Sequence, residues 1–345
     1  MTQAARLVDR HPAQDRTRLL EDLVPPPRFS GARFATYEPD PAQPSQHEAR
    51  ERVGRFAAGT DAGGGGAAGG GVLGRLLGAR PPASDAPRGV YLDGGFGVGK
   101  THLLAAAWHE AAGRKHYGTF VEYTHLAGAL GFRGAVDALR GADLVCIDEF
   151  ELDDPGDTVL MARLLRELAD AGARLAATSN TLPGALGSER FAAEDFLREI
   201  QALGRLFEVV TVDGEDYRHR GAPPTPEPAS PARLEALAGR PGATLDDFGA
   251  LCAHLATVHP SRYGALLDGV AEVGWSGVAP VPDQNVALRL VVLADRMYDR
   301  ALPLTAGGAP LSTLFGEDML RGGYRKKYLR ALSRLTALAR EAEVP

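Results

Sequence analysis

The sequence predicts an α/β fold, with a parallel sheet sandwiched by helices and a small helical domain after it. Two observations lead to this prediction. Over residues 89–220, short apolar runs alternate with stretches of helical periodicity, which is the pattern of βαβ units. After a Pro-rich stretch, the remaining residues have helical periodicity throughout. The apolar runs predicted to be buried strands are GVYLDGG, GTFVEY, ADLVCIDEF, RLAATSN and FEVVTVDG.

Composition limits the class of protein. The 345 residues are enough for two domains, and the net charge of -6 argues against a globally basic nucleic-acid binder. Two cysteines are too few for a disulfide framework or a zinc site, and both are expected to be buried thiols. No apolar run approaches the ~18 residues of a membrane span, and the N-terminus lacks the apolar middle of a signal peptide. We therefore expect a reducing, cytoplasmic location.

Composition shifts also predict the domain boundaries. The glycine tract and the Pro-rich stretch after it cannot bury apolar surface and are expected to be a flexible insertion. The expected parts are an N-terminal segment (1–58), the Gly/Pro-rich insertion (59–88), the α/β core (89–220), a Pro-rich linker (221–232) and the helical domain (233–345). Helices in the last part are expected over 245–258, 262–273, 285–298 and 317–340.

The first motif follows the strand GVYLDGG. The next residues, GGFGVGKT, lead into a helix and match the phosphate-loop pattern G-x-x-x-x-G-K-[ST] in its required strand–loop–helix setting. Glycines let backbone N–H groups turn toward an anion, and the helix start adds its positive dipole end. We expect Lys100 to reach the β- and γ-phosphates and the Thr101 hydroxyl to coordinate Mg²⁺. The expected nucleotide-binding residues are Gly94, Gly95, Phe96, Gly97, Val98, Gly99, Lys100, Thr101 and His102.

The second motif is the stretch LVCIDEFELDDPGD, an apolar run that ends in a group of carboxylates. Asp148 is expected at the carboxyl end of the sheet, where it would bind Mg²⁺. Successive side chains of a strand point to opposite sides, so the Glu149 side chain is expected to point away from that of Asp148. Glu149 is expected to orient and activate the attacking water. Asp153, Asp154 and Asp157 are expected to cap the next helix. A calcium loop is not supported because its Gly and bidentate Glu are absent. The hypothesis of a two-metal nuclease is weakened because the phosphate loop already explains the key acids.

Asn180 ends another core strand, RLAATSN. An amide at this position can hydrogen-bond the γ-phosphate and the lytic water, whereas the alternative is a turn-forming Asn close to Pro183. The phosphate loop and the acidic pair favour the sensor role. Glu151 receives no role.

The chain resembles the ZapE family, the cell-division branch of the AAA+ ATPases that also includes the mitochondrial lactation-elevated-protein ATPase. The resemblance is based on IDEFELDDPGD, ATSN, FLREI, VDGEDYRHR and LADRMYDRALPL in this order, with VPPPRF and PDPAQPSQ near the N-terminus. It covers most of the chain except the glycine tract. It implies an ATPase that acts as a homo-oligomer with nucleotide at subunit interfaces. It also implies division-linked work in bacteria and mitochondrial protein-quality control in eukaryotes. Together with the motifs, we expect a bacterial, cytoplasmic ATPase with a helical lid that uses ATP and Mg²⁺ and acts on a protein client, linked to division.

The family's motif positions fall on Lys100, Thr101, Asp148, Glu149 and Asn180. The resemblance also implies an arginine from a neighbouring subunit that stabilises charge on the γ-phosphate, an effect worth ~10³ or more in rate.

Arg190 is the candidate for this role. The chain departs from the family pattern here, reading SERFAAEDFLREI, so Arg198 and Arg205 remain alternatives. Arg289, on a lid helix, resembles a nucleotide-sensing arginine. A surface salt bridge is the alternative for both Arg190 and Arg289.

A rival hypothesis is a DNA-associated AAA+ ATPase, because LDGGFGVGKTHLL also resembles replication initiators and helicase loaders. In it, the basic run YRKKYLRALSR would contact DNA phosphates. The spacing of Leu329, Leu332 and Leu335 favours instead a helix with one packed face and solvated cations. No helix-turn-helix is evident near the C-terminus. A third hypothesis is a nucleotide-gated switch with little turnover. No N-K-x-D guanine motif occurs, which favours ATP.

Overall fold

The computed structural model describes residues 5–12, 18–60, 88–151, 155–183, 197–214 and 226–343. The chain divides into two compact units. One, here called the nucleotide unit, consists of Leu19–Pro25 and Gly31–Glu215. The other, here called the C-terminal unit, consists of Met1–Arg18, Pro26–Ser30 and Asp216–Pro345. Parts of the N-terminal segment therefore belong to each unit.

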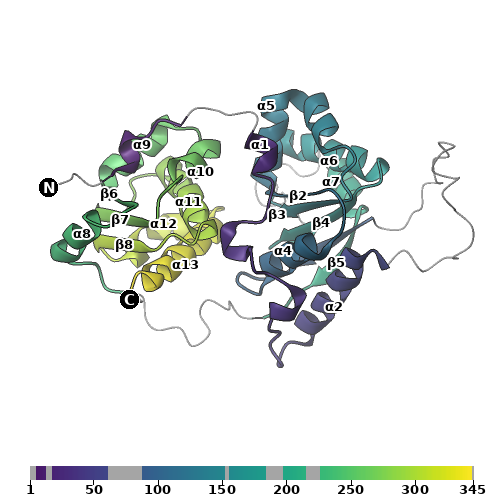
Figure 1. Cartoon of the computed structure of the whole chain (residues 1–345), viewed down its shortest axis with the longest axis horizontal. Helices are drawn as coiled ribbons and strands as arrows, with labels where there is room; N and C mark the ends of the chain where they lie inside the picture. The colour runs from purple at the N-terminus through teal and green to yellow at the C-terminus, as the bar shows by residue number, and fades with distance from the viewer. Residues whose placement is uncertain are drawn as a thin grey trace, which may run out of the picture. The chain divides into compact units, whose positions relative to one another are not determined.

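The nucleotide unit is built on a five-stranded sheet in the order β2-β3-β4-β1-β5 (Figure 1). All four neighbouring pairs are parallel. The strands are β1 (Gly89–Asp93), β2 (Lys115–Thr119), β3 (Leu144–Asp148), β4 (Arg174–Ser179) and β5 (Phe207–Thr211). The predicted parallel sheet is confirmed. Strand β4 lies between β1 and β3, so the ends of the phosphate-loop strand and the acidic strand meet on either side of it.

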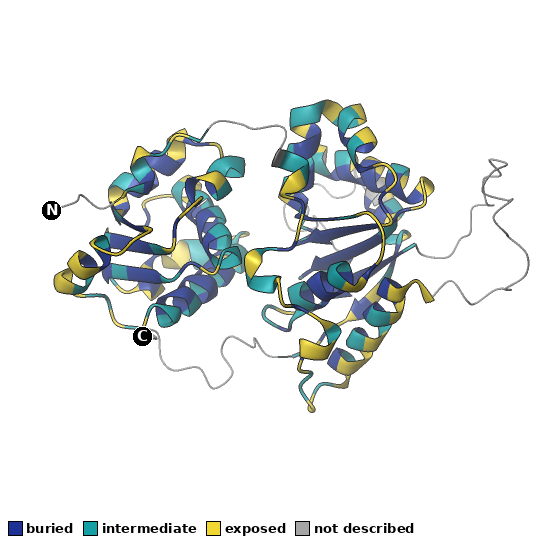
Figure 2. Cartoon of the chain, viewed as in Figure 1, coloured by how far each residue is buried: buried dark blue, intermediate teal, exposed yellow. Residues whose placement is uncertain are grey.

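Helices cover both faces of this sheet, and alternate strand residues pack on opposite sides. Tyr91 belongs to the apolar cluster with helices α5 (Phe120–Leu139), α6 (Pro155–Asp170) and α7 (Leu197–Gly204). Its neighbour Leu92 belongs to the cluster with α2 (Pro44–Ala58) and α4 (Lys100–Glu110). The inner strands are accordingly mostly dark blue in Figure 2, whereas the edge strand β5 also contains half-buried and exposed residues. Shorter helical pieces are α1 (Arg18–Glu21), η2 (Pro27–Phe29) and η3 (Phe34–Thr36).

One predicted strand is misplaced. GTFVEY was expected to be extended, but strand β2 ends at Thr119 and α5 begins at Phe120. The physical reason is a capping box. The Thr119 side chain accepts from the Glu122 backbone N–H, and the Glu122 side chain accepts from the Thr119 N–H at 2.7 Å. This reciprocal cap begins a helix in a stretch whose apolar and aromatic residues favour a strand.

The C-terminal unit is not all helical, and this part of the prediction is wrong. It contains a three-stranded parallel sheet in the order β6-β7-β8. The strands are β6 (Ala243–Asp247), β7 (Glu272–Val278) and β8 (Leu304–Gly308). Each strand is short and buried, and β6 runs directly into a helix, so periodicity alone did not separate it from that helix. The helices are α8 (Pro231–Ala238), α9 (Phe248–Thr257), α10 (Tyr263–Leu266), α11 (Gln284–Asp299), α12 (Glu317–Arg321) and α13 (Arg325–Glu341).

The first residues of the chain complete the core of the C-terminal unit. Leu7, in the 3₁₀ helix η1 (Leu7–Asp9), is fully buried in its apolar cluster. Ala5 forms a parallel bridge with Thr244, and Asp246 accepts from the backbone N–H groups of Leu7 at 3.0 Å and Val8 at 3.1 Å. Burial raises the pKa of Asp246, while these two hydrogen bonds lower it.

The basic run on α13 differs from the expected solvated face. Arg330 and Arg334 are buried, and both pair with Asp295 of α11, Arg330 at 2.9 Å. Their exposure in water was the wrong expectation, because an acid on the facing helix holds both guanidinium groups. Of the three leucines expected on the packed face, Leu335 is fully buried, whereas Leu329 and Leu332 are half-buried. The buried face is formed by Tyr328, Ala331, Leu335, Leu338 and Ala339. In the parts of the chain that the structure describes, no helix is long and apolar enough to cross a membrane.

Candidate active site

The phosphate loop joins β1 to α4 and is shaped by glycines. Gly94 approaches the strand-end backbone so closely that a Cβ there would lie 2.1 Å from the Val212 carbonyl oxygen. Gly99 has a φ of 92°, in the left-handed region, and is the residue before α4. The loop therefore turns directly into the helix N-terminus, as the motif requires.

The ammonium group of Lys100 contacts backbone carbonyl oxygens of the phosphate loop. Its Nζ donates to the carbonyl oxygens of Gly94, at 2.6 Å, and Gly95, and to Asn180 Oδ1 at 2.8 Å. Lys100 is buried, with 8% of its surface exposed. The bond to Asn180 joins the phosphate loop to the end of β4, so two separately predicted site residues are in direct contact.

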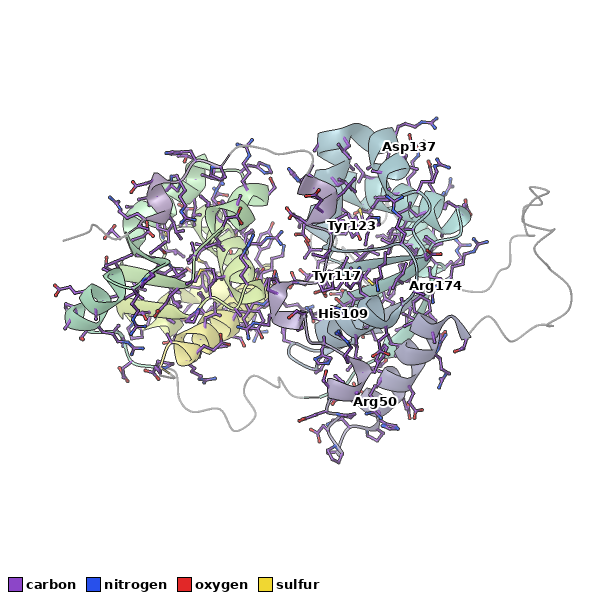
Figure 3. All side chains as sticks on the ribbon, in the orientation of Figure 1. Arg50, His109, Tyr117, Tyr123, Asp137 and Arg174 are labelled. Carbon is purple, nitrogen blue, oxygen red and sulfur yellow. The ribbon has the colours of Figure 1, made fainter. Side chains whose placement is uncertain are left out.

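Asp148 is held by hydroxyl and amide donors on both carboxylate oxygens. Its Oδ1 accepts from the Thr101 hydroxyl at 3.3 Å, from the Glu149 N–H at 3.2 Å and from the Thr178 hydroxyl. Its Oδ2 accepts from the Tyr117 hydroxyl at 2.8 Å; Tyr117 lies on β2 in the nucleotide unit (Figure 3). This set of donors fixes the orientation of a carboxylate that is only 5% exposed.

Glu149 has an unusual backbone. Its φ of 53° is in the left-handed region, which costs a non-glycine residue of order 1 kcal/mol or more. Its N–H donates to Thr178 Oγ1 at 3.1 Å as well as to Asp148. The turn immediately after β3 therefore depends on Thr178, and it sets the direction in which the Glu149 side chain leaves the strand.

The sequence interpretation missed three contributors to this site. Tyr117 and Thr178 orient Asp148, and Glu151 accepts from Asn180 Nδ2 at 3.5 Å. A hydroxyl residue near the end of each strand beside β3 was a usable signal for the first two. Glu151 had no such signal because its contact depends on the turn after β3.

Of the three acids expected to cap the helix after LVCIDEF, the structure describes one. Asp153 and Asp154 lie outside the described residues. Asp157 is in the first turn of α6, which begins at Pro155. An acid at this position is stabilised by the helix dipole, as expected.

The arginines expected to act in the site lie in different parts of the chain. Arg190 lies outside the described residues. Arg198 is exposed on α7, and Arg205, also exposed, has its Nε 3.4 Å from the Gln201 carbonyl. Arg289 belongs to the C-terminal unit, where it donates to the carbonyl oxygens of Leu255 at 3.1 Å and Val258 at 3.3 Å. These two hydrogen bonds cap the C-terminal end of α9 and differ from the surface salt bridge that was the alternative.

Of the other expected nucleotide contacts, Phe96 is half-buried in the loop and His102 is half-buried on the first turn of α4. Both cysteines are buried thiols, as expected. Burial raises the pKa of Cys146 and raises the pKa of Cys252 to about 11. Neither is a thiolate near neutral pH.

The donor set at the loop suits magnesium. The Thr101 hydroxyl and the Asp148 carboxylate are both hard oxygen ligands, and they are within 3.3 Å of each other. Mg²⁺ typically uses one or two protein oxygens together with phosphate oxygens and water. Within the described ranges, no group of three or more His, Cys, Asp or Glu side chains forms a metal cage. The residues present therefore fit a cation that arrives with nucleotide phosphates.

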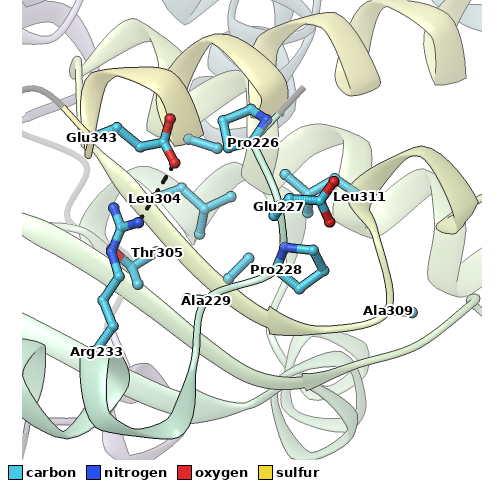
Figure 4. A pocket seen from close by; sticks show the side chains of 12 residues that line it. Pro226, Glu227, Pro228, Ala229, Arg233, Leu304, Thr305, Ala309, Leu311 and Glu343 are labelled. Atoms are coloured by element: carbon cyan, nitrogen blue, oxygen red, sulfur yellow. Dashed lines mark ion pairs between the residues drawn. The ribbon is translucent and has the colours of Figure 1, made fainter. Parts of the chain in front are cut away.

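A small hollow in the C-terminal unit has different chemistry. Residues 226–229 line it together with β8, and Arg233 and Glu343 form an ion pair beside it at 3.6 Å (Figure 4). Arg233 and Glu343 are paired with each other, and Glu227 is a further carboxylate in the lining.

The fold and the loop together define the class. A parallel sheet with a phosphate loop after β1, an acid after β3 and an amide after the strand between them is the core of a P-loop ATPase of the AAA+ class.

The chain belongs to the AFG1-like ATPase family, whose sequence profile matches residues 13–238 and 232–344. The expected resemblance to ZapE is confirmed. Cell division protein ZapE of Escherichia coli K12 is 28% identical over 315 residues, covering 78% of this chain and 83% of that protein. Lactation elevated protein 1 homolog B of Danio rerio is 27% identical over 161 residues, covering 40% of this chain and 32% of that protein.

Solved structures are more distant. AMPPCP-bound DnaA from Aquifex aeolicus aligns with a TM-score of 0.37 and 16% identity over 53% of this chain and 50% of that one. A similarity this slight supports no argument about function.

Proposed function

We propose that this ATPase hydrolyses Mg-ATP and couples turnover to remodelling of a protein partner in cell division. The observation that carries the proposal is the convergence at one sheet edge. Lys100 contacts Asn180 at 2.8 Å, and Thr101 contacts Asp148 at 3.3 Å, so loop, acid and amide meet where a γ-phosphate would be bound. The family membership supplies the ATPase activity that this geometry serves.

Each side chain has a separate task in hydrolysis. Lys100 exchanges loop carbonyls for phosphate oxygens, and Asn180 orients the γ-phosphate and the lytic water. The water oxygen attacks phosphorus, the bond to the β-phosphate oxygen breaks, and Glu149 takes the proton from the water. Thr101 and Asp148 would hold Mg²⁺, which neutralises charge on the phosphates.

The division role and the protein client rest on the similarity to ZapE, whose name assigns it to cell division. We propose a homo-oligomer with nucleotide at the subunit interfaces. Arg190 is proposed to act from a neighbouring subunit, with Arg198 and Arg205 as the alternatives, and Arg289 to respond to nucleotide in the lid.

The test is ATP turnover and ATP binding by the full chain and two variants. Lys100→Ala removes the cation under the phosphates and should abolish binding. Glu149→Gln keeps the shape of the site but removes the base, so it should bind ATP normally and lose turnover by ~10²-fold or more. Turnover that survives Glu149→Gln would contradict the base assignment, and undiminished binding by Lys100→Ala would contradict the phosphate site.

The same Glu149→Gln variant identifies the client. It should retain ATP and hold the partner, so a pull-down with ATP should enrich a protein that Lys100→Ala does not. Negligible turnover by the unaltered protein would favour the nucleotide-gated switch instead.

The DNA-associated alternative loses part of its expected contact surface. Two cations of the basic run, Arg330 and Arg334, are buried against Asp295 and are not presented to phosphates. Stimulation of ATPase activity by DNA is the result that would restore this alternative.

A further inference from the structure

The N-terminal segment lies against the phosphate loop through Tyr37. We propose that Tyr37 is a positioning residue for ATP binding: it holds the peptide between Val98 and Gly99 in the orientation that the loop needs to bind phosphates. This inference rests on the proposed nucleotide site and assigns to it a residue from outside the phosphate-loop motif.

Two contacts carry the inference. The Tyr37 hydroxyl donates to the Val98 carbonyl oxygen at 2.9 Å, in a buried setting. The ring also occupies the space beside Gly99, where an added Cβ would lie 2.4 Å from Tyr37 Cε2. Tyr37 is 6% exposed and Val98 is 4% exposed, so water does not substitute for this hydrogen bond.

The orientation of one peptide group follows from the hydrogen bond. No described peptide bond is cis, so the C=O of Val98 and the N–H of Gly99 point in opposite directions. Fixing the carbonyl on Tyr37 therefore directs the Gly99 N–H away from Tyr37. Backbone N–H groups of a phosphate loop are its phosphate ligands, so rotation of this peptide would withdraw one of them.

The segment that carries Tyr37 is itself fixed to the nucleotide unit. At one end, the Phe34 N–H donates to Glu110, the last residue of α4, at 3.1 Å. The His102 ring nitrogen Nε2 lies 3.0 Å from the Arg33 carbonyl oxygen. The His102 ring also packs on Tyr37, with centroids 5.7 Å apart.

Beyond Tyr37 the chain is held by Gln46. Its Nε2 donates to the Asp213 carbonyl at 2.7 Å, and its Oε1 accepts from the Asp40 N–H at 2.8 Å. Tyr37 is therefore fixed on both sides along the chain, and it can hold the loop without moving with it.

The first experiment compares Tyr37→Phe with a matched control, Tyr123→Phe. Both changes remove one buried phenol hydroxyl that donates to a backbone carbonyl, since Tyr123 donates to the Cys146 carbonyl at 3.1 Å (Figure 3). Tyr37→Phe should raise the Kd and KM for ATP about five- to ten-fold while kcat at saturating ATP stays close to that of the unaltered protein. Tyr123→Phe should lower the thermal midpoint of unfolding about as much as Tyr37→Phe lowers it, and it should leave the KM for ATP unchanged.

Unchanged KM in Tyr37→Phe would overturn the inference, as would an equal rise in KM in Tyr123→Phe. These results differ from failure of the proposed function, in which the unaltered protein itself would neither bind nor hydrolyse ATP.

A second experiment uses the contact at Gly99. An added Cβ must displace the Tyr37 ring, and at a φ of 92° it also strains the loop backbone, so Gly99→Ala removes the same support together with part of the loop geometry. The effect of Tyr37→Phe on ATP affinity should then shrink to less than about two-fold in the Gly99→Ala background, because coupled neighbours are non-additive. Full additivity of the two changes would contradict the proposed support.

Discussion

At the residue scale, the turn after β3 contains the one non-glycine residue with a positive φ that the structure describes in the nucleotide unit. Glu149 adopts a φ of 53°, and its N–H is held by Asp148 and Thr178. Backbone strain of this kind is retained where the direction of a side chain matters for function. Glu149 directly follows Asp148, the acid that would bind the metal. The neighbouring Tyr117 and Thr178 hydroxyls show that Asp148 is oriented by its surroundings before any ligand arrives.

The strain at Glu149 predicts that substitution by glycine is less destabilising than substitution by alanine. Glycine adopts a positive φ without penalty, whereas alanine keeps the cost of a Cβ. Glu149→Gly should therefore be more stable than Glu149→Ala by ~1 kcal/mol, measured as the free energy of unfolding in urea. An alanine variant that is as stable as the glycine variant would show that the turn relaxes.

At the scale of elements, η2 is anchored to α11 and α13 by one side chain. The Arg28 guanidinium lies 4.0 Å from the centre of the Tyr298 ring, donates from Nε to the Tyr298 carbonyl at 2.7 Å, and pairs with Glu341 at 2.9 Å. Planar stacking and a two-point pair with a carboxylate require arginine in particular. Arg28 of the motif VPPPRF thus has a structural role in the C-terminal unit.

Arg28→Ala should therefore destabilise the C-terminal unit by ~1–2 kcal/mol. The matched control is Arg321→Ala, because the Arg321–Glu317 pair is also an Arg–Glu contact, at 2.6 Å, but its side chains are 75% and 81% exposed. Removing an exposed pair should change stability by less than ~0.5 kcal/mol. Hydrogen exchange of α13 amides reports on this unit directly, and equal effects of the two substitutions would contradict the anchoring role.

At the scale of the whole molecule, the two units draw on separate parts of the chain. The C-terminal unit takes Leu7 into its core, and Leu7 is 239 positions away in sequence from its hydrogen-bond partner Asp246. Its sheet and core are therefore incomplete without the first residues of the chain.

Deletion of residues 1–12 should accordingly destabilise the C-terminal unit. Residues 1–12 both cover Asp246 and donate two hydrogen bonds to it, so their loss acts on the pKa of Asp246 in opposite directions. The expected loss of stability instead comes from the removal of Leu7 from the core and of two backbone donors from Asp246. It should appear as a lower free energy of unfolding at pH 7, measured by urea unfolding of the full chain and the deletion variant. An unchanged free energy of unfolding would contradict this account.

The sequence by itself determined the features whose signals are local. Strand, loop and helix are contiguous at the phosphate loop, so the positions of Lys100 and Thr101 followed from one short motif. The acid at the end of β3 and the amide at the end of β4 followed from the rule that parallel strands present their carboxyl ends at one edge. These residues lie together in the structure because that edge forms as expected.

Only the tertiary structure decided the features that join distant parts of the chain. The sheet in the C-terminal unit was missed because its short buried strands adjoin helices with the same apolar content. The contact of Tyr37 with Val98 and the burial of Leu7 beside β6 had no local signal, since their partners are far away in sequence. Likewise, the burial of Arg330 and Arg334 depends on Asp295 of another helix. The physical reason is common to these features: the energy of a contact depends on two surfaces that are far apart in the sequence, and a sequence window contains only one of them.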